Sequence, residues 1–531
     1  MVSSSFGTLL LAAVAAAQAP TDSVPLYDNL GDHHRAITTR VPRAQLYFDQ
    51  GLRLVYGFNH AEAIRAFHEA ARLDPDCAMC NWGTALAHGP HVNAGMDSAS
   101  GVAAYAAVRQ ARARASRASP WERAYIRALE RRYARIPPAN RAGLDSAYAA
   151  AMGEVVRQYP DDQDAATLYA EALMDLRPWN YWMPNGDPYP GTVEILRLIE
   201  GVLEDNPNHP GACHYYIHAV EAKQPELAVP CAERLAALMP GVGHMVHMPA
   251  HIYIRVGRWA DAVESNVHAI HSDEVYIEGQ HPMGVYPIAY YPHNIHFLAF
   301  AATMAGQSGP AIDAARQLVA QTPIEVARQV PFVWPFVPFL HLTLVTFGRW
   351  NEVLEQPLPP ADLRVPYAMA QYARGVALAA LGRWSEAQVA ADTVRQIAAA
   401  TAAGDPRTML DIATHALLGE IAARQGHLDE AVAHFTQAIR LEDGLLYFEP
   451  PTWYYPVRQS LGAVLLRAGR AAEAEAAYRE DLRRFPENGW SLFGLMASLR
   501  AQGRSAEADA VDQRFRRAWG RADVTLTASR F

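Results

Sequence analysis

A glycine-centred turn recurs along this chain of 531 residues. In each copy a glycine follows an apolar run, a polar residue comes next, and an acidic residue, usually followed by alanine, opens the next run. Glycine commonly ends a helix because it adopts a left-handed backbone at no steric cost. Two pairs of these glycines, 348 and 382 and then 469 and 503, are 34 residues apart. The pattern predicts an array of helix–turn–helix repeats. The copies are VGRWADA (256–262), FGRWNEV (347–353), LGRWSEA (381–387), QGHLDEA (425–431), AGRAAEA (468–474) and QGRSAEA (502–508).

A 34-residue unit with a glycine turn and an alanine in its second helix resembles the tetratricopeptide repeat (TPR). HAEAIRAFHEAARLDP (60–75) is similar to a second helix of this repeat, and CNWGTALAHG (80–89) is similar to the next first helix. The resemblance covers most of residues 45–520. It implies an all-α, TPR-type right-handed solenoid whose first helices line a concave groove that binds a peptide, a protein or a small molecule. The layout also resembles exported bacterial TPR proteins of unassigned activity.

The N-terminal residues 1–19 resemble a secretory signal peptide. The apolar run Leu9–Ala17 is too short to span a bilayer, and Ala17-Gln18-Ala19 offers a small-x-small cleavage site, although the usual positive charge before the run is missing. We therefore expect an exported protein, periplasmic or secreted, with no transmembrane segment. The predicted organisation is a signal peptide (1–19), an N-terminal extension (20–44), the solenoid (45–520) with His-rich repeats at about 205–320, and a C-terminal tail (521–531).

Composition argues for a globular chain and against a nucleic-acid partner. Hydrophobic residues make up 50% of the chain and charged residues 19%, with a formal net charge of −9. No block of Lys and Arg of the kind that follows a phosphate backbone is present. The Arg-rich stretch 109–117 is interpreted as the solvated face of a helix.

Histidines are concentrated in the middle of the chain, where ten of the 21 lie between residues 213 and 296. They recur 13, 10 and 6 residues before Gly257, and again 13 and 10 residues before Gly306. Two more precede the turn near Lys223 by about 10 and 6 residues. Offsets of 3, 4 and 7 place side chains on one helical face, which predicts a histidine ladder across three adjacent repeats. Its members are His214, His218, His244, His247, His251, His293 and His296.

The histidine ladder predicts a transition-metal site, because three or four neutral imidazoles bind zinc, copper or iron. Copper is favoured if Met245, Met248 or Met283 also ligates. Glu221, three residues after His218, could be a ligand, a partner that orients an imidazole, or a catalytic general base. The leading hypothesis is an exported metal-binding protein with oxidoreductase or hydrolase activity.

Other interpretations stay open from sequence alone. A single histidine on a helix is usually a structural residue, and a polar groove could bind a peptide or a small anion instead of a metal. The second functional hypothesis is a non-catalytic scaffold that binds a peptide or a partner protein. Pro249 could start a helix and leave His244 and His247 on a loop, whereas His268 and His271 belong to a second helix and are predicted to be surface or packing residues.

Three Pro- and aromatic-rich stretches interrupt the repeats: 175–191, 280–294 and 446–458. Proline stops helices, and insertions in a solenoid tend to gather on its binding face. Such loops could contact a substrate or, alternatively, plug the groove. The candidate groove residues are Trp179, Trp182, Tyr290, Tyr291, Trp453 and Tyr454.

The four cysteines permit two disulfides in an oxidising compartment. Cys77 and Cys80 have redox or metal spacing, but a local disulfide is the simpler interpretation because no second pair completes a zinc site. Cys213 could pair with Cys231 and pin two helices of one repeat, or remain a free thiolate that binds copper.

Overall fold

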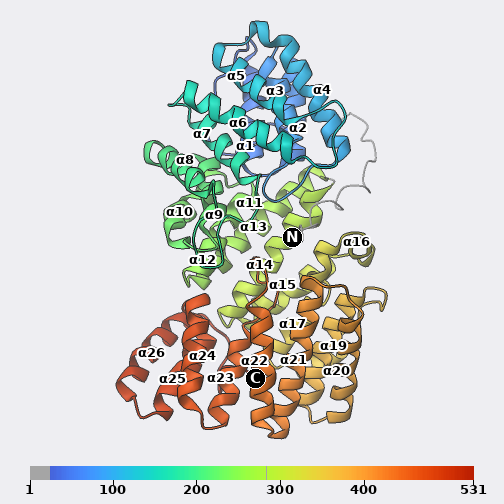
Figure 1. Cartoon of the computed structure of the whole chain (residues 1–531), viewed down its shortest axis with the longest axis vertical. Coiled ribbons are helices and arrows are strands. Elements are labelled where there is room, and N and C mark those ends of the chain that lie inside the picture. Colours follow the sequence, from blue (N-terminus) through green and yellow to red (C-terminus); the bar gives the residue numbers. More distant parts are fainter. Residues whose placement is uncertain (1–23, 283) are drawn as a thin grey trace. The chain divides into compact units, whose positions relative to one another are not determined.

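The computed structural model describes residues 24–282 and 284–531, and Figure 1 shows their arrangement. The predicted signal peptide, the first residues of the N-terminal extension and Met283 lie outside the described residues. The described part is helical with no β-strand in it, only isolated bridges, which confirms the all-α prediction. The chain forms two compact units. Unit 1 contains the described residues up to Ile252 and those of His268–Pro287, and unit 2 contains Tyr253–Val267 and Ile288–Phe531.

Unit 1 begins with paired helices and ends with the helices that carry most of the histidine ladder. Helices α12 (Pro249–Arg255) and α13 (Trp259–Gln280) contribute residues to both units. The remaining helices of unit 1 are α1 (Pro42–Tyr56), α2 (His60–Leu73), α3 (Ala78–Ala87), α4 (Ser98–Arg114), α5 (Pro120–Leu129), α6 (Ala142–Gln158), α7 (Gln163–Met174), α8 (Thr192–Asp205), α9 (Pro210–Val220), α10 (Val229–Leu238) and α11 (Gly243–His247), with short 3₁₀ turns at Ala115–Arg117, Glu130–Arg132 and Pro225–Ala228.

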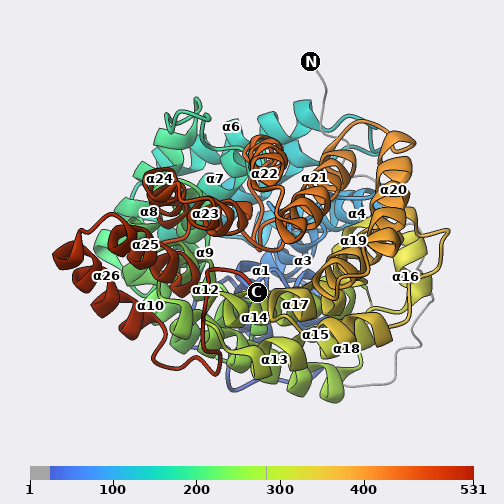
Figure 2. The ribbon, with the colours of Figure 1, turned by 90° about the horizontal axis from the view of Figure 1, so that it is seen from below.

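Unit 2 is a succession of helix pairs, and Figure 2 shows α19 to α26 following one another in chain order. A π-helical turn (Tyr286–Tyr290) leads into this unit, and a 3₁₀ segment (Pro331–Phe336) interrupts it. Its helices are α14 (Tyr291–Met304), α15 (Ser308–Ala320), α16 (Ile324–Gln329), α17 (Phe339–Thr346), α18 (Trp350–Glu355), α19 (Arg364–Ala380), α20 (Trp384–Ala399), α21 (Asp405–Gln425), α22 (Leu428–Glu442), α23 (Val457–Arg467), α24 (Ala471–Arg484), α25 (Gly489–Ala501) and α26 (Ser505–Ala518).

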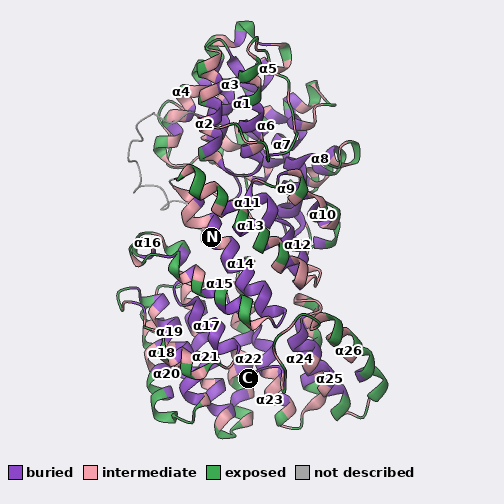
Figure 3. Cartoon of the chain, turned by 180° about the vertical axis from the view of Figure 1, so that it is seen from behind, coloured by how far each residue is buried: buried purple, intermediate pink, exposed green. Residues whose placement is uncertain are grey.

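The recurrent glycines occupy the turns for which the sequence predicted them. Gly257, Gly348, Gly382, Gly426, Gly469 and Gly503 all have positive φ, between 67° and 86°. This left-handed conformation ends the first helix of each pair and lets the chain reverse into the second. Figure 3 shows that the buried residues line the faces where neighbouring helices meet.

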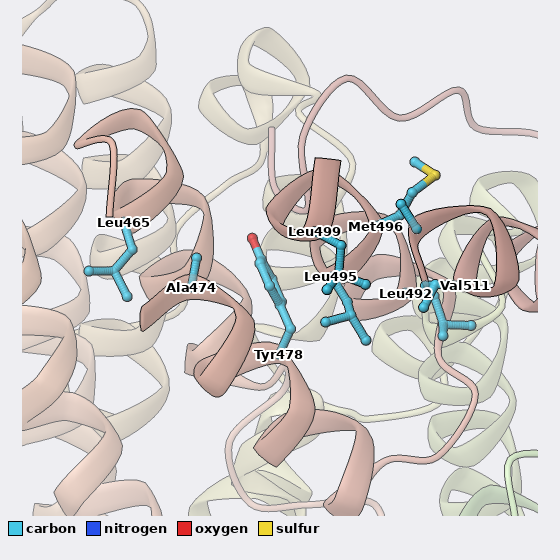
Figure 4. Packing of buried hydrophobic residues seen from close by; sticks show 9 residues of the cluster. Leu465, Ala474, Tyr478, Leu492, Leu495, Met496, Leu499 and Val511 are labelled. Atoms are coloured by element: carbon cyan, nitrogen blue, oxygen red, sulfur yellow. The ribbon is translucent and has the colours of Figure 1, made fainter. Parts of the chain in front are cut away.

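The last repeats of unit 2 show why small residues are needed between paired helices. Tyr478 of α24 is fully buried in a cluster with Leu465, Leu495 and Leu499 (Figure 4). A Cβ added at Gly462 of α23 or at Gly494 of α25 would overlap the Tyr478 ring. The missing side chains therefore make room for the tyrosine, as dense packing in a protein core requires.

The N-terminal segment before α1 is fastened to unit 1 by buried polar contacts. Arg35 donates to Asp162 at 2.6 Å and to Asp164 at 2.9 Å, and its guanidinium lies 4.1 Å from the centre of the Trp121 ring. His33 Nε2 lies 3.0 Å from the same Asp164 carboxylate. The predicted extension is thus part of the packed structure of this unit.

The tail after α26 packs back onto unit 2. The Arg530 guanidinium lies 3.9 Å from the centre of the Tyr455 ring, and Ser529 Oγ lies 2.7 Å from the Tyr478 hydroxyl. Arg424 of α21 donates to the Phe531 carbonyl at 2.9 Å. These contacts extend the core beyond the last helix.

Within the described residues, none of the helices combines the length and the apolar character needed to cross a membrane.

We predict that Gly494→Ala lowers the free energy of unfolding by about 1–3 kcal/mol, because the added methyl group overpacks the Tyr478 cluster. Gly201→Ala in α8 is the matched control, since a Cβ there has nothing within 4 Å. The free energy of unfolding of this control is expected to rise by up to about 1 kcal/mol, because alanine has a higher helix propensity than glycine. Thermal and urea unfolding of both variants measure the effects, and equal stability of the two variants would contradict the packing argument.

We predict that Arg35→Ala destabilises unit 1 by about 1.5–3 kcal/mol at pH 7, because the buried Asp164 and the half-buried Asp162 lose a charged donor. Burial by itself raises the pKa of Asp164, but bonds from His209 and His33 and the charge of Arg35 prevail and hold it well below its usual range. The stability difference from the wild type therefore shrinks as the pH falls below about 4, where the carboxylates of the unfolded chain are protonated. Arg40→Ala, which removes an exposed arginine of the same segment, is the control.

Candidate metal centre

Helix α9 carries two histidines one turn apart. The helix begins with Pro210 at its first position, and the His209 side chain accepts a hydrogen bond from the backbone amide of Ala212, which caps the helix. His214 and His218 are four residues apart and point to the same face. Glu221 follows at the C-terminal end of the helix, and all residues from Pro210 to Glu221 are buried.

The second set of histidines lies on α11 and α12. His244 and His247 are on α11, and His251 is on α12, which begins at Pro249 as expected for a proline in the first turn. The proline does not leave His244 and His247 on a loop. All three side chains are buried, so unit 1 gathers five histidines of the predicted ladder in its interior.

Three of these histidines form a compact group. His214, His218 and His244 offer one ligand nitrogen each, and these atoms lie within 4.8 Å of one another. His214 Nε2 and His244 Nε2 are 3.1 Å apart. His218 Nε2 is buried and has no hydrogen-bond partner among the described residues. A buried polar nitrogen without a partner is unfavourable unless it binds something.

The hydrogen-bond partner of Nδ1 decides whether Nε2 of the same imidazole keeps the lone pair that binds a metal ion. His214 Nδ1 lies 2.6 Å from the backbone carbonyl of Tyr56, and a carbonyl can only accept, so Nδ1 carries the proton and Nε2 keeps its lone pair. His218 Nδ1 lies 3.4 Å from Glu221 Oε1. Because a carboxylate only accepts, Nδ1 of His218 also carries the proton and its Nε2 keeps the lone pair. Carboxylate or carbonyl partners of this kind hold metal-ligating imidazoles in one orientation.

Burial keeps these imidazoles neutral. It lowers the pKa of His218 and lowers the pKa values of His214 and His244 well below the usual value, and neighbouring imidazoles lower them further. For Glu221, burial raises the pKa, but the interactions with His251 and His218 prevail and lower it to about 2. Neutral imidazole is the form that binds metal ions, and the carboxylate stays ionised beside it.

Aromatic residues that sequence reasoning missed cover the group. The Phe58 ring stacks on His91 at 4.2 Å and packs on His214 at 4.4 Å between ring centroids. Phe58 has a left-handed backbone with φ of 56°, which is rare for a bulky side chain and costs about 1–2 kcal/mol. The only sequence signal was the Gly57-Phe58-Asn59 turn between α1 and α2.

The loop 175–191 also reaches the group. Trp179 lies edge-on to His218 at 5.1 Å between ring centroids, and its φ is 63°. Trp182 is buried and donates from its indole to the Ala219 carbonyl at 2.7 Å. This loop therefore packs against the end of α9.

The other four predicted groove residues lie in unit 2 and are buried. Trp453 and Tyr454 pack around Tyr372, whose hydroxyl lies 3.1 Å from that of Tyr454. Gln317 donates to the Tyr291 hydroxyl at 3.0 Å, and Tyr290 is also buried. Apolar rings of this size are stabilised more by filling the core than by facing water.

His293 and His296 both lie on α14, in unit 2. The His296 ring packs edge-on to Phe339 at 4.4 Å and against Phe336 at 5.2 Å between ring centroids, and burial lowers its pKa to about 3. His293 lies edge-on to Phe297. Among the described residues, His296 belongs to no group of three potential ligands, so its assignment to the ladder reflects sequence register alone.

All four cysteines form disulfides. Cys77 and Cys80 are bonded at the start of α3, and Cys213 and Cys231 join α9 to α10, with Cα atoms 5.1 Å apart. Since Cys213 is bonded, it offers no thiolate to a metal beside His214.

A second group with the composition of a metal site, His33, Asp164 and His209, lies elsewhere in unit 1. Its carboxylate already receives the Tyr56 hydroxyl at 2.5 Å, His33 Nε2 and Arg35. With a guanidinium in contact, the group works as an anchor for the N-terminal segment.

Comparisons with known proteins concern the repeats. Residues 412–444 match the tetratricopeptide repeat family. Similar solved structures include the human IFIT1 dimer (14% identity, 91% of each chain, TM-score 0.33) and yeast Tom70 (12% identity, 92% of this chain and 93% of that chain, TM-score 0.28). Another is the TPR domain of P58(IPK) (11% identity, 87% of this chain and 99% of that chain, TM-score 0.23). None of the curated proteins matches. Residues 412–444 are therefore a tetratricopeptide repeat, and the left-handed glycine turns and paired helices of unit 2 have the same architecture.

Proposed function

We propose that this TPR protein binds a transition-metal ion through His214, His218 and His244. The observation that carries the proposal is the convergence of three buried, neutral imidazoles whose ligand nitrogens lie within 4.8 Å of one another. His214 and His218 have their outer nitrogen engaged by Tyr56 and by Glu221, which leaves Nε2 facing the group. Three imidazoles with a position left open are typical of metal sites that also bind water or a substrate.

The donor set favours copper. Imidazole nitrogen suits zinc, copper and iron, and copper(II) binds nitrogen donors most tightly among the divalent ions of this series. Copper bound here would supply one-electron chemistry, which makes an oxidoreductase the leading reaction class. Glu221 then acts as a positioning residue through His218, in place of the general-base role that the sequence also allowed.

Strained aromatic residues beside the imidazoles support a functional site. Of the described non-glycine residues with left-handed backbones, Phe58 and Trp179 both contact the histidine group. Backbone strain of this kind gathers at ligand sites, where the surrounding structure must hold a side chain in one place. The rings also exclude water, which strengthens polar interactions inside.

Export is part of the proposal. Two disulfides in one chain support an oxidising compartment, since cytosolic proteins keep their thiols reduced. Such a compartment agrees with the expected signal peptide, and the Cys213–Cys231 bond fixes α9 next to the ligand His214.

A second candidate function is a protein-interaction scaffold, which the repeat match at 412–444 favours. A cavity of about 370 Å³ in unit 2 is lined by α21, α23 and α25, the first helices of successive repeats, and by the tail. Its charged lining includes Glu420, Arg424 and Arg467. Repeat arrays use this face to bind peptides or partner proteins.

We predict that full-length protein purified without a histidine tag contains about one or more copper, zinc or iron ions per chain by elemental analysis. The variant His214→Ala/His244→Ala is expected to lose at least about tenfold in metal affinity, because two of three donors are gone. The control is His268→Ala/His271→Ala, which removes two exposed histidines from α13 of the same unit. Circular dichroism of each variant establishes that the helices are intact.

Less than about 0.2 metal per chain after reconstitution, unchanged between variant and control, would contradict the metal proposal. That result would leave the scaffold function as the better account of the protein.

A further inference from the structure

The histidines of unit 1 fall into two groups, each with its own pair of facing nitrogens. His214 Nε2 and His244 Nε2 are 3.1 Å apart, and His247 Nε2 and His251 Nε2 are 2.9 Å apart. Two imidazole nitrogens on one tetrahedral ion, each at about 2.0–2.1 Å from it, lie about 3.3 Å from each other. Both pairs therefore have nearly the spacing of ligands that share an ion.

The two pairs cannot serve one and the same ion. The group whose ligand atoms all lie within 4.8 Å consists of His214, His218 and His244, and within the described part of unit 1 neither His247 nor His251 joins it. Unit 1 thus supplies three imidazoles to a first position and two to a second.

Glu221 connects the two groups. Its Oε1 lies 3.4 Å from His218 Nδ1, and its Oε2 lies 2.9 Å from His251 Nδ1. Because a carboxylate only accepts, each imidazole directs Nδ1 toward Glu221 and turns Nε2 toward its own group. One buried carboxylate thereby orients one ligand of each position, and its negative charge offsets part of the positive charge that both positions would hold.

We infer that the centre binds two metal ions: one at His214, His218 and His244, and one at His247 and His251, with Glu221 as the shared positioning residue. This inference rests on the proposed function. At each position the imidazoles leave part of the coordination shell open to water or substrate. A pair of adjacent copper ions would give the centre two one-electron carriers, which suits a substrate that exchanges two electrons.

The test is a titration of the metal-free full-length protein with Cu²⁺, followed by calorimetry and by equilibrium dialysis. The wild type is expected to take up two equivalents. His247→Ala/His251→Ala is expected to keep the equivalent bound by His214, His218 and His244 and to lose the other. Glu221→Gln, whose amide can accept from only one imidazole through its oxygen, is expected to weaken both steps by about 10–100-fold. His268→Ala/His271→Ala again serves as the control.

The outcomes separate the two proposals. No uptake by the wild type would overturn metal binding altogether. A single equivalent that His247→Ala/His251→Ala leaves unchanged would overturn the two-ion inference and leave the three-histidine site in place.

Electron paramagnetic resonance of the wild type loaded with two equivalents gives a measurement that needs no variant. Protein-bound copper that accounts for both equivalents is expected, and a second equivalent that remains as aqueous copper would overturn the inference.

Discussion

The paired helices depend on chain reversals between them, and a left-handed glycine makes these reversals without steric strain. Each turn glycine ends one helix with positive φ, so the next helix packs back along it and buries the face they share. Because the turns recur, residues at a fixed distance before a turn come to equivalent places in successive pairs. Functional side chains can therefore recur at a fixed number of residues before each turn, and the histidines before Gly257 are spaced in this way.

The fold could be predicted from sequence because its signals are local. Glycine turns, alanine-rich second helices and the 34-residue spacing each act over a few neighbouring residues, and all of them point to the same architecture. The chemistry of α9 was also predictable, since His214 and His218 lie on one helix, Glu221 caps its C-terminal end, and helix periodicity brings the three together. The disulfides were proposed as alternatives, and the bonded state follows from helix packing that sequence spacing does not show.

What could not be predicted depends on contacts between distant segments. Phe58 joins the histidines because the turn after α1 adopts a left-handed backbone at a residue other than its glycine. The Tyr56 carbonyl, which sets the tautomer of His214, lies 158 residues away along the chain. The burial of the aromatic loops also depends on distant segments, because the hydrophobic effect draws large rings into whatever interior those segments form. Register along a helix also says nothing about which unit a helix joins, and this is why His296 was placed in the ladder although it lies among phenylalanine rings.

Trp179 gives the histidine group a property of a different kind. Its indole lies edge-on to His218. The same loop is held to the last turn of α9 by the hydrogen bond from Trp182 to the Ala219 carbonyl. Indole emission responds to the electronic state of whatever touches the ring, and a paramagnetic ion nearby quenches it. The intrinsic fluorescence of Trp179 therefore reports on binding at the imidazoles, and no added label is needed.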